Sequence, residues 1–151
     1  MENWNILLIE CNPADVRVWR SALASPSPLP ATLQIVERAD EAITRLESHD
    51  LPLPSLIIFN TRLPAKLRTP EIDSAIRELR RKAAGPVLFF CGSDDKADVE
   101  RAYRGYASSY TRIPEDPERY AHVVRSTLEF WLTLVQLPRP YHPVIPEDVP
   151  H

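Results

Sequence analysis

Asn60 and Glu10 are polar residues that directly follow short apolar runs. The runs are Ile6 to Ile9 and Leu56 to Phe59, and neither has a polar residue at alternate positions. We therefore predict two strands that are buried on both faces, as at the centre of a parallel sheet. Open α/β sheets usually bind their ligands at the carboxyl ends of such strands. Asn60 and Glu10 thus mark a candidate site.

The elements that would position this site alternate regularly along the chain. Apolar runs predict strands at 5–10, 32–37, 55–60, 87–91 and 106–111. Apolar spacing with capping residues predicts helices at 13–24, 40–47, 70–83 and 117–136, and a further helix that Ser93, Asp94 and Asp95 cap and that runs to about 104. Such alternation is typical of a doubly wound α/β fold, in which helices cover both faces of a parallel sheet. We expect one domain over residues 1–136. The last fifteen residues, 137–151, contain five prolines and predict an extended tail.

The composition excludes several classes of function. The 151 residues are 26% charged and 44% hydrophobic, with a net charge of −3, which gives no electrostatic attraction to nucleic acid or to an anionic membrane. No apolar run approaches the roughly 20 residues of a membrane span. The three glycines are not clustered, so a glycine-rich phosphate loop is absent. Two cysteines and a start without a signal peptide favour the cytoplasm.

Three segments, at 6–15, 56–64 and 87–95, resemble the CheY-like receiver domains of two-component response regulators. Segments of the last helix, at 123–126 and 130–138, resemble the stand-alone subgroup associated with bacterial phytochromes. The resemblance covers about residues 5 to 138. It implies a flavodoxin-like, three-layer sandwich with five parallel strands in the order 2-1-3-4-5. It also implies a role in phosphorelay signal transduction, with a sensor histidine kinase or another signalling protein as partner.

The resemblance also implies an altered phosphorylation site. In the family, two acids and a phospho-accepting Asp hold Mg²⁺, while a Ser or Thr and a Lys contact the phosphoryl group. This chain keeps Glu10 as one acid. The remaining positions carry Cys11 for the second acid, Asn60 for the acceptor, Cys91 for the Thr or Ser, and Ile113 for the Lys. Arg68 replaces a small residue eight positions past the acceptor.

These replacements predict a pseudo-receiver that lacks phosphorylation chemistry. An amide is not a usable nucleophile toward phosphorus, and one carboxylate is a poor site for a dication, so we expect no catalytic residue, no cofactor and weak or absent Mg²⁺ binding. Asp15, Ser93 and Asp94 lie near the same edge, but helix capping explains them better. Two alternatives remain open: a receiver phosphorylated at an atypical acceptor, and a module that senses a ligand or thiol modification at the former site.

Cys11 and Cys91 could support redox or metal chemistry. In the implied strand order one strand lies between theirs, which separates them by roughly 9 to 10 Å, whereas disulfides need Cα atoms within about 7 Å. Neither loop contains a His, so we expect no metal site there. We expect two small buried cysteines.

Tyr110 falls at the family's aromatic switch position on the fifth strand. In the family, the rotamer of this residue reports phosphorylation to a partner surface. The alternative is a half-exposed strand tyrosine without a switching role. The resemblance also predicts a cis bond between Ile113 and Pro114.

The last helix is apolar on more than one side. Tyr120, Val123, Val124, Thr127 and Trp131 predict the stripe that packs on the sheet, which continues to Leu134 and Val135. The predicted interface lies off that stripe, at Leu128, Phe130 and Leu132. We expect a twofold homodimer through this surface. The alternative is that the tail folds back over it.

Overall fold

A computed structural model describes residues 3–48, 53–62, 70–105 and 107–138 of the chain. It contains one five-stranded sheet whose strands follow the order β2-β1-β3-β4-β5, and each neighbouring pair is parallel. The strands are β1 (Trp4–Ile9), β2 (Ala31–Val36), β3 (Leu56–Thr61), β4 (Val87–Cys91) and β5 (Ser109–Arg112). The predicted doubly wound fold and strand order are confirmed.

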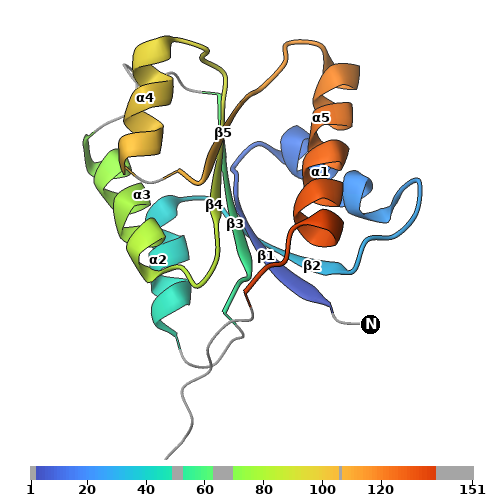
Figure 1. Cartoon of the computed structure of the whole chain (residues 1–151), viewed down its shortest axis with the longest axis horizontal. Coiled ribbons are helices and arrows are strands. Elements are labelled where there is room, and N and C mark those ends of the chain that lie inside the picture. Colours follow the sequence, from blue (N-terminus) through green and yellow to red (C-terminus); the bar gives the residue numbers. More distant parts are fainter. Residues whose placement is uncertain (1–2, 49–52, 63–69, 106, 139–151) are drawn as a thin grey trace, which may run out of the picture.

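Helices cover both faces of the sheet (Figure 1). Their bounds are α1 (Pro13–Ala24), α2 (Ala39–Glu47), α3 (Pro70–Lys82), α4 (Lys96–Gly105) and α5 (Pro117–Glu129), and a π-helical turn, η2 (Phe130–Leu134), continues α5. Helices α1 and α5 pack side by side on one face, and α2, α3 and α4 lie on the other (Figure 1). In the part of the chain that the structure describes, no helix is long and apolar enough to cross a membrane.

The central strands separate two cores because successive side chains point to opposite faces. Ile6, Leu8 and Ile58 pack beneath α1 and α5, whereas Leu7 and Ile57 pack beneath α2 and α3. The core beneath α1 and α5 contains an edge-on contact between Trp19 and Phe90, whose ring centroids lie 5.1 Å apart. The core beneath α2 and α3 contains a stack of Phe59 on Phe89, whose ring centroids lie 5.4 Å apart. Burial on both faces explains why these strands lack alternating polar residues.

The predicted helix starts at Asn12 and Asp116 are confirmed. The Asn12 side chain accepts a hydrogen bond from the Ala14 amide at 2.8 Å, and Asp116 accepts one from Glu118 at 3.1 Å. Each cap precedes a proline at the first helical position, where no amide hydrogen is needed. These caps fix where α1 and α5 begin at the carboxyl edge of the sheet.

The predicted start of α4 agrees with the structure, whereas one predicted peptide bond does not. Helix α4 starts at Lys96, directly after the predicted capping residues, and the Asp95 side chain accepts a hydrogen bond from the Ala97 amide at 2.9 Å. Among the described residues the one cis peptide bond lies between Ser25 and Pro26, so the expectation of a cis Ile113–Pro114 bond is wrong.

The predicted domain end at 136 falls inside packed structure. Leu137 is 7% exposed and packs against the core under α1 and α5. Residues 139–151 of the predicted tail lie outside the described residues, so the tail stays a prediction.

Candidate functional site

Asn60 lies at the carboxyl end of β3, the central strand, and its side chain is 4% exposed. Strand β3 continues for two residues, Asn60 and Thr61, past the end of β1, so Asn60 lies beside the loop that contains Glu10. Gly92 lets the loop after β4 approach closely, because a Cβ there would lie 2.8 Å from the Arg62 carbonyl oxygen. The backbone of β3 and the next residue is thereby held at the sheet edge.

The Asn60 amide is hydrogen-bonded at both ends. Its Nδ2 donates to Glu10 Oε2 and, at 3.3 Å, to Asp15 Oδ2. Its Oδ1 accepts from the Tyr120 hydroxyl at 3.0 Å. Because ionised carboxylates can only accept, the NH₂ group must face them and the oxygen must face the tyrosine. The structure therefore joins Glu10 and Asn60, which the resemblance placed in one site, and both ends of the Asn60 amide bind other protein groups.

Asp15 forms a two-point ion pair with Arg62. Arg62 Nε donates to Asp15 Oδ2 at 3.0 Å and Arg62 Nη2 donates to Oδ1 at 2.9 Å. The Asp15 side chain is 6% exposed, whereas that of Arg62 is 47% exposed. The guanidinium carbon also lies 5.2 Å from the centre of the Tyr120 ring, within cation–π range. The explanation of Asp15 as a simple helix-start residue is therefore incomplete.

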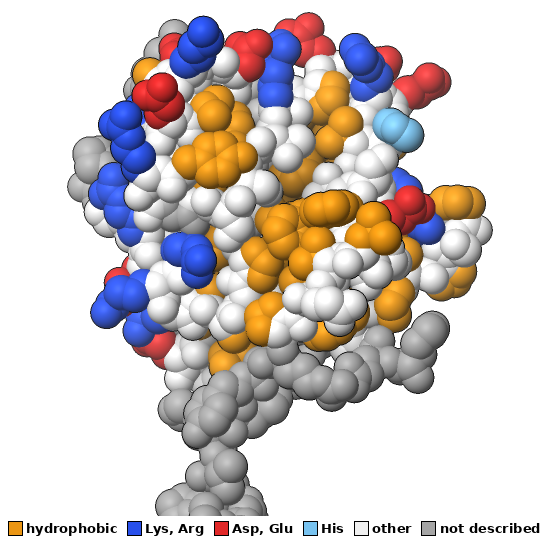
Figure 2. Space-filling model, in the orientation of Figure 1, with side chains coloured by type: hydrophobic (Ala, Val, Ile, Leu, Met, Phe, Trp, Pro, Cys, Tyr) orange, Lys and Arg blue, Asp and Glu red, His pale blue; other side chains and the backbone are white. Residues whose placement is uncertain are grey.

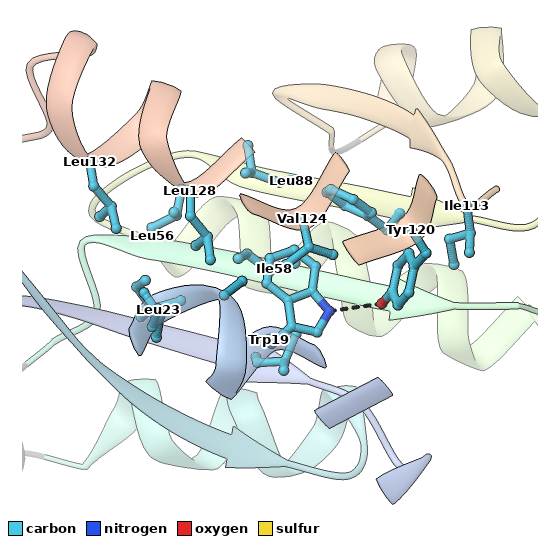
Figure 3. Packing of buried hydrophobic residues seen from close by; sticks show 14 of the residues in the cluster. Trp19, Leu23, Leu56, Ile58, Leu88, Ile113, Tyr120, Val124, Leu128 and Leu132 are labelled. Atoms are coloured by element: carbon cyan, nitrogen blue, oxygen red, sulfur yellow. Dashed lines mark hydrogen bonds between the residues drawn. The ribbon is translucent and has the colours of Figure 1, made fainter. Parts of the chain in front are cut away.

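Trp19 and Tyr120 connect this group to the core between α1 and α5. Trp19 Nε1 donates to the Tyr120 hydroxyl at 2.9 Å, and both side chains are at most 2% exposed (Figure 3). Burial raises the pKa of Tyr120, so its hydroxyl keeps the proton that it donates to Asn60. We call Glu10, Asp15, Trp19, Asn60, Arg62 and Tyr120 the edge network.

Glu10 is the member of the edge network without a cationic partner. It is 6% exposed, and its Oε1 accepts the Asn12 amide at 2.8 Å. Burial raises the pKa of Glu10, while hydrogen bonds from Asn12 and Asn60 lower it. Within the described ranges, no Lys, Arg or His lies at ion-pair distance from this carboxylate.

The other predicted site residues, Cys91, Ile113 and Cys11, are not part of the edge network. Cys91 is fully buried at the end of β4, and Ile113 is 2% exposed beyond β5, where its amide donates to the Cys91 carbonyl at 2.7 Å. Cys11 is exposed, so the expectation of two buried cysteines is wrong for this residue. Strand β3 separates β1 from β4, and neither cysteine is in a disulfide. Arg68 lies outside the described residues.

The described residues do not fit a divalent cation. Such an ion needs several oxygen ligands, but Asn60 presents its NH₂ group to the acids and Arg62 binds both oxygens of Asp15. Cys11 would offer a soft sulfur ligand in place of an acid. Across the described ranges, no group of three or more His, Cys, Asp or Glu residues could hold a metal ion.

Tyr110 is half-buried on β5 and its hydroxyl donates to the Ser93 carbonyl at 2.6 Å. Its ring centre lies 5.5 Å from that of Phe89. The side chain is therefore held toward the loop between β4 and α4.

The exposed apolar residues of the last helix differ from the predicted interface residues. Leu128 and Leu132 are 0% and 6% exposed and belong to the core with Tyr120 and Val124, so they offer no free surface. Phe130 is 49% exposed and Leu134 is 73% exposed. Apolar side chains also gather on the visible surface over the C-terminal half of α5 (Figure 2).

No protein-family model and no curated protein matches this sequence. Solved structures do match. The Mn²⁺-bound form of response regulator Rcp1 is 25% identical, with 89% of this chain and 99% of that chain covered and a TM-score of 0.74. The phosphorylated cyanobacterial phytochrome response regulator RcpA is also 25% identical, with 90% and 99% covered and a TM-score of 0.74. Response regulator RPA3017, in red light signaling of R. palustris, is 20% identical, with 89% and 97% covered and a TM-score of 0.71. These likenesses confirm the resemblance to response-regulator receiver domains.

Proposed function

We propose that this receiver-fold protein is a pseudo-receiver, which takes part in two-component signalling through protein contacts and without aspartyl phosphorylation. The observation that carries the proposal is the internal engagement of Asn60. Both ends of its amide bind other protein groups, and the side chain is almost fully buried. No nucleophilic atom is left at the position where a phosphorylated receiver presents a carboxylate oxygen.

Arg62 supports the proposal because it gives a protein cation to Asp15, the carboxylate that accepts a hydrogen bond from Asn60 at the former acceptor position. Its two-point contact neutralises Asp15 without an exchangeable ligand. A metal ion would have to displace this guanidinium and also rotate the Asn60 amide away from Tyr120. We therefore propose that Mg²⁺ binding is weak and that the chain has no enzymatic activity of its own.

The positions that would contact a phosphoryl group give further support. Cys91 provides no hydroxyl group and Ile113 provides no ammonium group. Both side chains are buried. A transferred phosphoryl group would meet neither the hydrogen-bond donor nor the positive charge that stabilise it in a receiver.

The proposed partners are a sensor histidine kinase or another signalling protein in the cytoplasm, and a second copy of this chain. The bond from Tyr110 to Ser93 would keep the switch residue in one position, so its surface would not depend on phosphorylation. Phe130 and Leu134 are the exposed apolar residues that a dimer through the last helix would cover. Sedimentation of the full chain and of Leu134→Glu tests this: a wild-type monomer at micromolar concentration would reject the dimer.

Phosphorylation is tested by incubating the protein with Mg²⁺ and acetyl phosphate, followed by intact mass measurement. RcpA, which is known in a phosphorylated form, serves as the positive control. We expect a mass shift for RcpA and none for this protein. Beryllofluoride with Mg²⁺ should likewise leave the fluorescence of the chain unchanged. A stable phosphoryl adduct on the chain would reject the pseudo-receiver.

A further inference from the structure

A cleft of about 340 Å³ opens beside the edge network. It lies at the carboxyl ends of β1 and β3, against the start of α2 and one residue of α3. Strand β1 lies between β2 and β3, so the connection after β1 runs to one side of β1 and the connection after β3 runs to the opposite side, toward β4. Doubly wound sheets bind ligands in the crevice at such a switch point. The volume falls within the usual range for small-molecule sites, roughly 300 to 1,000 Å³.

The cleft has apolar walls. Ile9 and Phe59 contribute from the two strands, while Ala39 and Ala75 contribute from the two helices. The short alanine side chains leave the space open. Walls of this kind favour the burial of hydrocarbon or an aromatic ring.

The electrostatic character of the cleft is negative. Glu10 lines it, and the carboxylate of this residue has amide partners but no cation among the described residues. Because Arg62 neutralises Asp15, the edge network as a whole keeps one uncompensated negative charge. Glu37 and Asp40 add two carboxylates at the rim.

Among the described lining residues, Arg38 is the cation, and it is already paired. Its Nε lies 3.3 Å from Asp40 and 3.5 Å from Glu41. An anionic ligand would therefore meet repulsion from Glu10 and Glu37, and the described lining offers it no unpaired guanidinium. A cationic ligand would meet a buried carboxylate where the low polarity of the surroundings strengthens the attraction.

We propose that this cleft binds a small organic cation, in which an apolar or aromatic body fills the space between β1, β3, α2 and α3 and an ammonium group pairs with Glu10. A bare metal ion does not suit it, because no three His, Cys, Asp or Glu side chains of the described residues lie close enough together to hold one. The site is independent of the proposed loss of phosphorylation, since its ligand would contact Glu10 from the cleft and leave Asn60 in place.

The proposal is tested with three probes of the same shape and different charge: phenethylamine, 2-phenylethanol and phenylacetate. Binding to the full chain is followed by amide NMR shifts during titration at physiological salt. We expect phenethylamine to shift residues at the ends of β1 and β3 and at the start of α2. The alcohol should bind at least about tenfold more weakly, equivalent to about 1.4 kcal/mol, and phenylacetate should not bind. Equal binding of amine and alcohol, or no binding of the amine at millimolar concentration, would overturn the proposal.

Two variants separate charge from shape. Glu10→Gln should weaken amine binding by about tenfold and leave the alcohol unchanged, whereas Ala75→Leu should fill the cleft and weaken both probes. Glu115→Gln, an exposed acid in the loop before α5, is the matched control and should bind the amine as the wild type does. Unchanged amine binding in both Glu10→Gln and Ala75→Leu would reject the site. The phosphorylation assay is a separate readout, so either proposal can fail without the other.

Discussion

On one half of the carboxyl edge, at the ends of β1 and β3, the buried side chains carry charge and are hydrogen-bonded to one another. On the other half, at the ends of β4 and β5, Cys91 and Ile113 are buried without charge. In the proposed pseudo-receiver, the two halves would correspond to the metal-binding and phosphoryl-binding sides of a phosphorylated receiver. The first half contains buried carboxylates, one of them paired with Arg62, and the second contains buried side chains without charge.

This difference shows why one replacement alone would be costly. A buried carboxylate requires a cation or strong donors, and Asp15 has both in Arg62 and Asn60. A buried lysine would in turn require a carboxylate beside it. Ile113 needs neither, and it packs in the same core as Tyr120. The first half therefore stabilises the buried charge of Asp15 by pairing it, whereas the second half contains no buried charge that needs a partner.

The largest expected effect is that of returning a charge to the apolar half. Ile113→Lys would bury an ammonium group at a position that is 2% exposed, and we expect it to lower the free energy of unfolding by about 3–5 kcal/mol. Ile113→Met, which keeps the volume, should cost less than about 1.5 kcal/mol. Urea denaturation measures both. Equal stability of the Lys and Met variants would show that the apolar half tolerates charge.

Asn60→Asp adds charge to the other half. It would place a third carboxylate beside Glu10 and Asp15 and remove the two hydrogen bonds from Nδ2, at an expected cost of about 2–3 kcal/mol at neutral pH. The cost should shrink in acid, where the new carboxyl is protonated. We expect no Mg²⁺-dependent phosphorylation of this variant, and a mass shift with acetyl phosphate would contradict that.

The double variant Asn60→Asp with Ile113→Lys tests whether the halves communicate. A new Asp–Lys attraction should make the double variant more stable than the sum of the single effects by about 0.5–3 kcal/mol. Strict additivity would indicate that the halves are independent.

Tyr120→Phe tests the hydrogen bonds that link the edge network to the core. Removal of the hydroxyl leaves Trp19 Nε1 without its acceptor and Asn60 Oδ1 without its donor, both in buried positions, so we expect a loss of about 1–3 kcal/mol. Tyr110→Phe is the matched control: its hydroxyl binds the Ser93 carbonyl from a half-buried position, and the loss should be smaller. Thermal unfolding of the two variants measures both losses of stability. A larger loss for Tyr110→Phe than for Tyr120→Phe would contradict the role given to Tyr120.

The smallest expected effect concerns the pH dependence of Glu10. Burial raises the pKa of this carboxyl above its ordinary value of 4.5, so the folded protein binds the proton more tightly than the unfolded chain does. The contribution of Glu10 to stability is therefore full below pH 4.5 and falls as the pH rises through the folded pKa. The stability of the wild type relative to Glu10→Gln should decline over that interval. A relative stability that rises instead would reverse the assigned direction.

The sequence was sufficient for the fold because its signals are local. Apolar runs, prolines and capping residues act over a few positions, and Asn12 and Asp116 form the caps that their spacing predicts. The placement of Glu10 and Asn60 in one site was implied by the resemblance to receiver domains, and the structure joins them by a hydrogen bond.

The remaining edge network depends on contacts between distant positions. Arg62 approaches Asp15 from 47 residues away, and Tyr120 approaches Trp19 from 101 residues away, so no spacing rule revealed them. One signal was present for Asp15: Asn12 already capped the helix, which left this acid without need of a capping role. In the last helix, the series Tyr120, Val124, Leu128 and Leu132 repeats every four residues and marks the buried face better than the predicted stripe.

The bonds from Trp19 to Tyr120 and from Tyr120 to Asn60 also have a consequence for the order of folding. Their partners lie 101 and 60 residues apart, and closing such long loops costs chain entropy before any bond forms. The hydrogen bond to the Asn60 carbonyl oxygen requires Tyr120, so it cannot form before α5 is synthesised and docked. Formation of the complete edge network therefore reports the docking of α5, and the fluorescence of Trp19 in a chain without Trp4 and Trp131 would time that step.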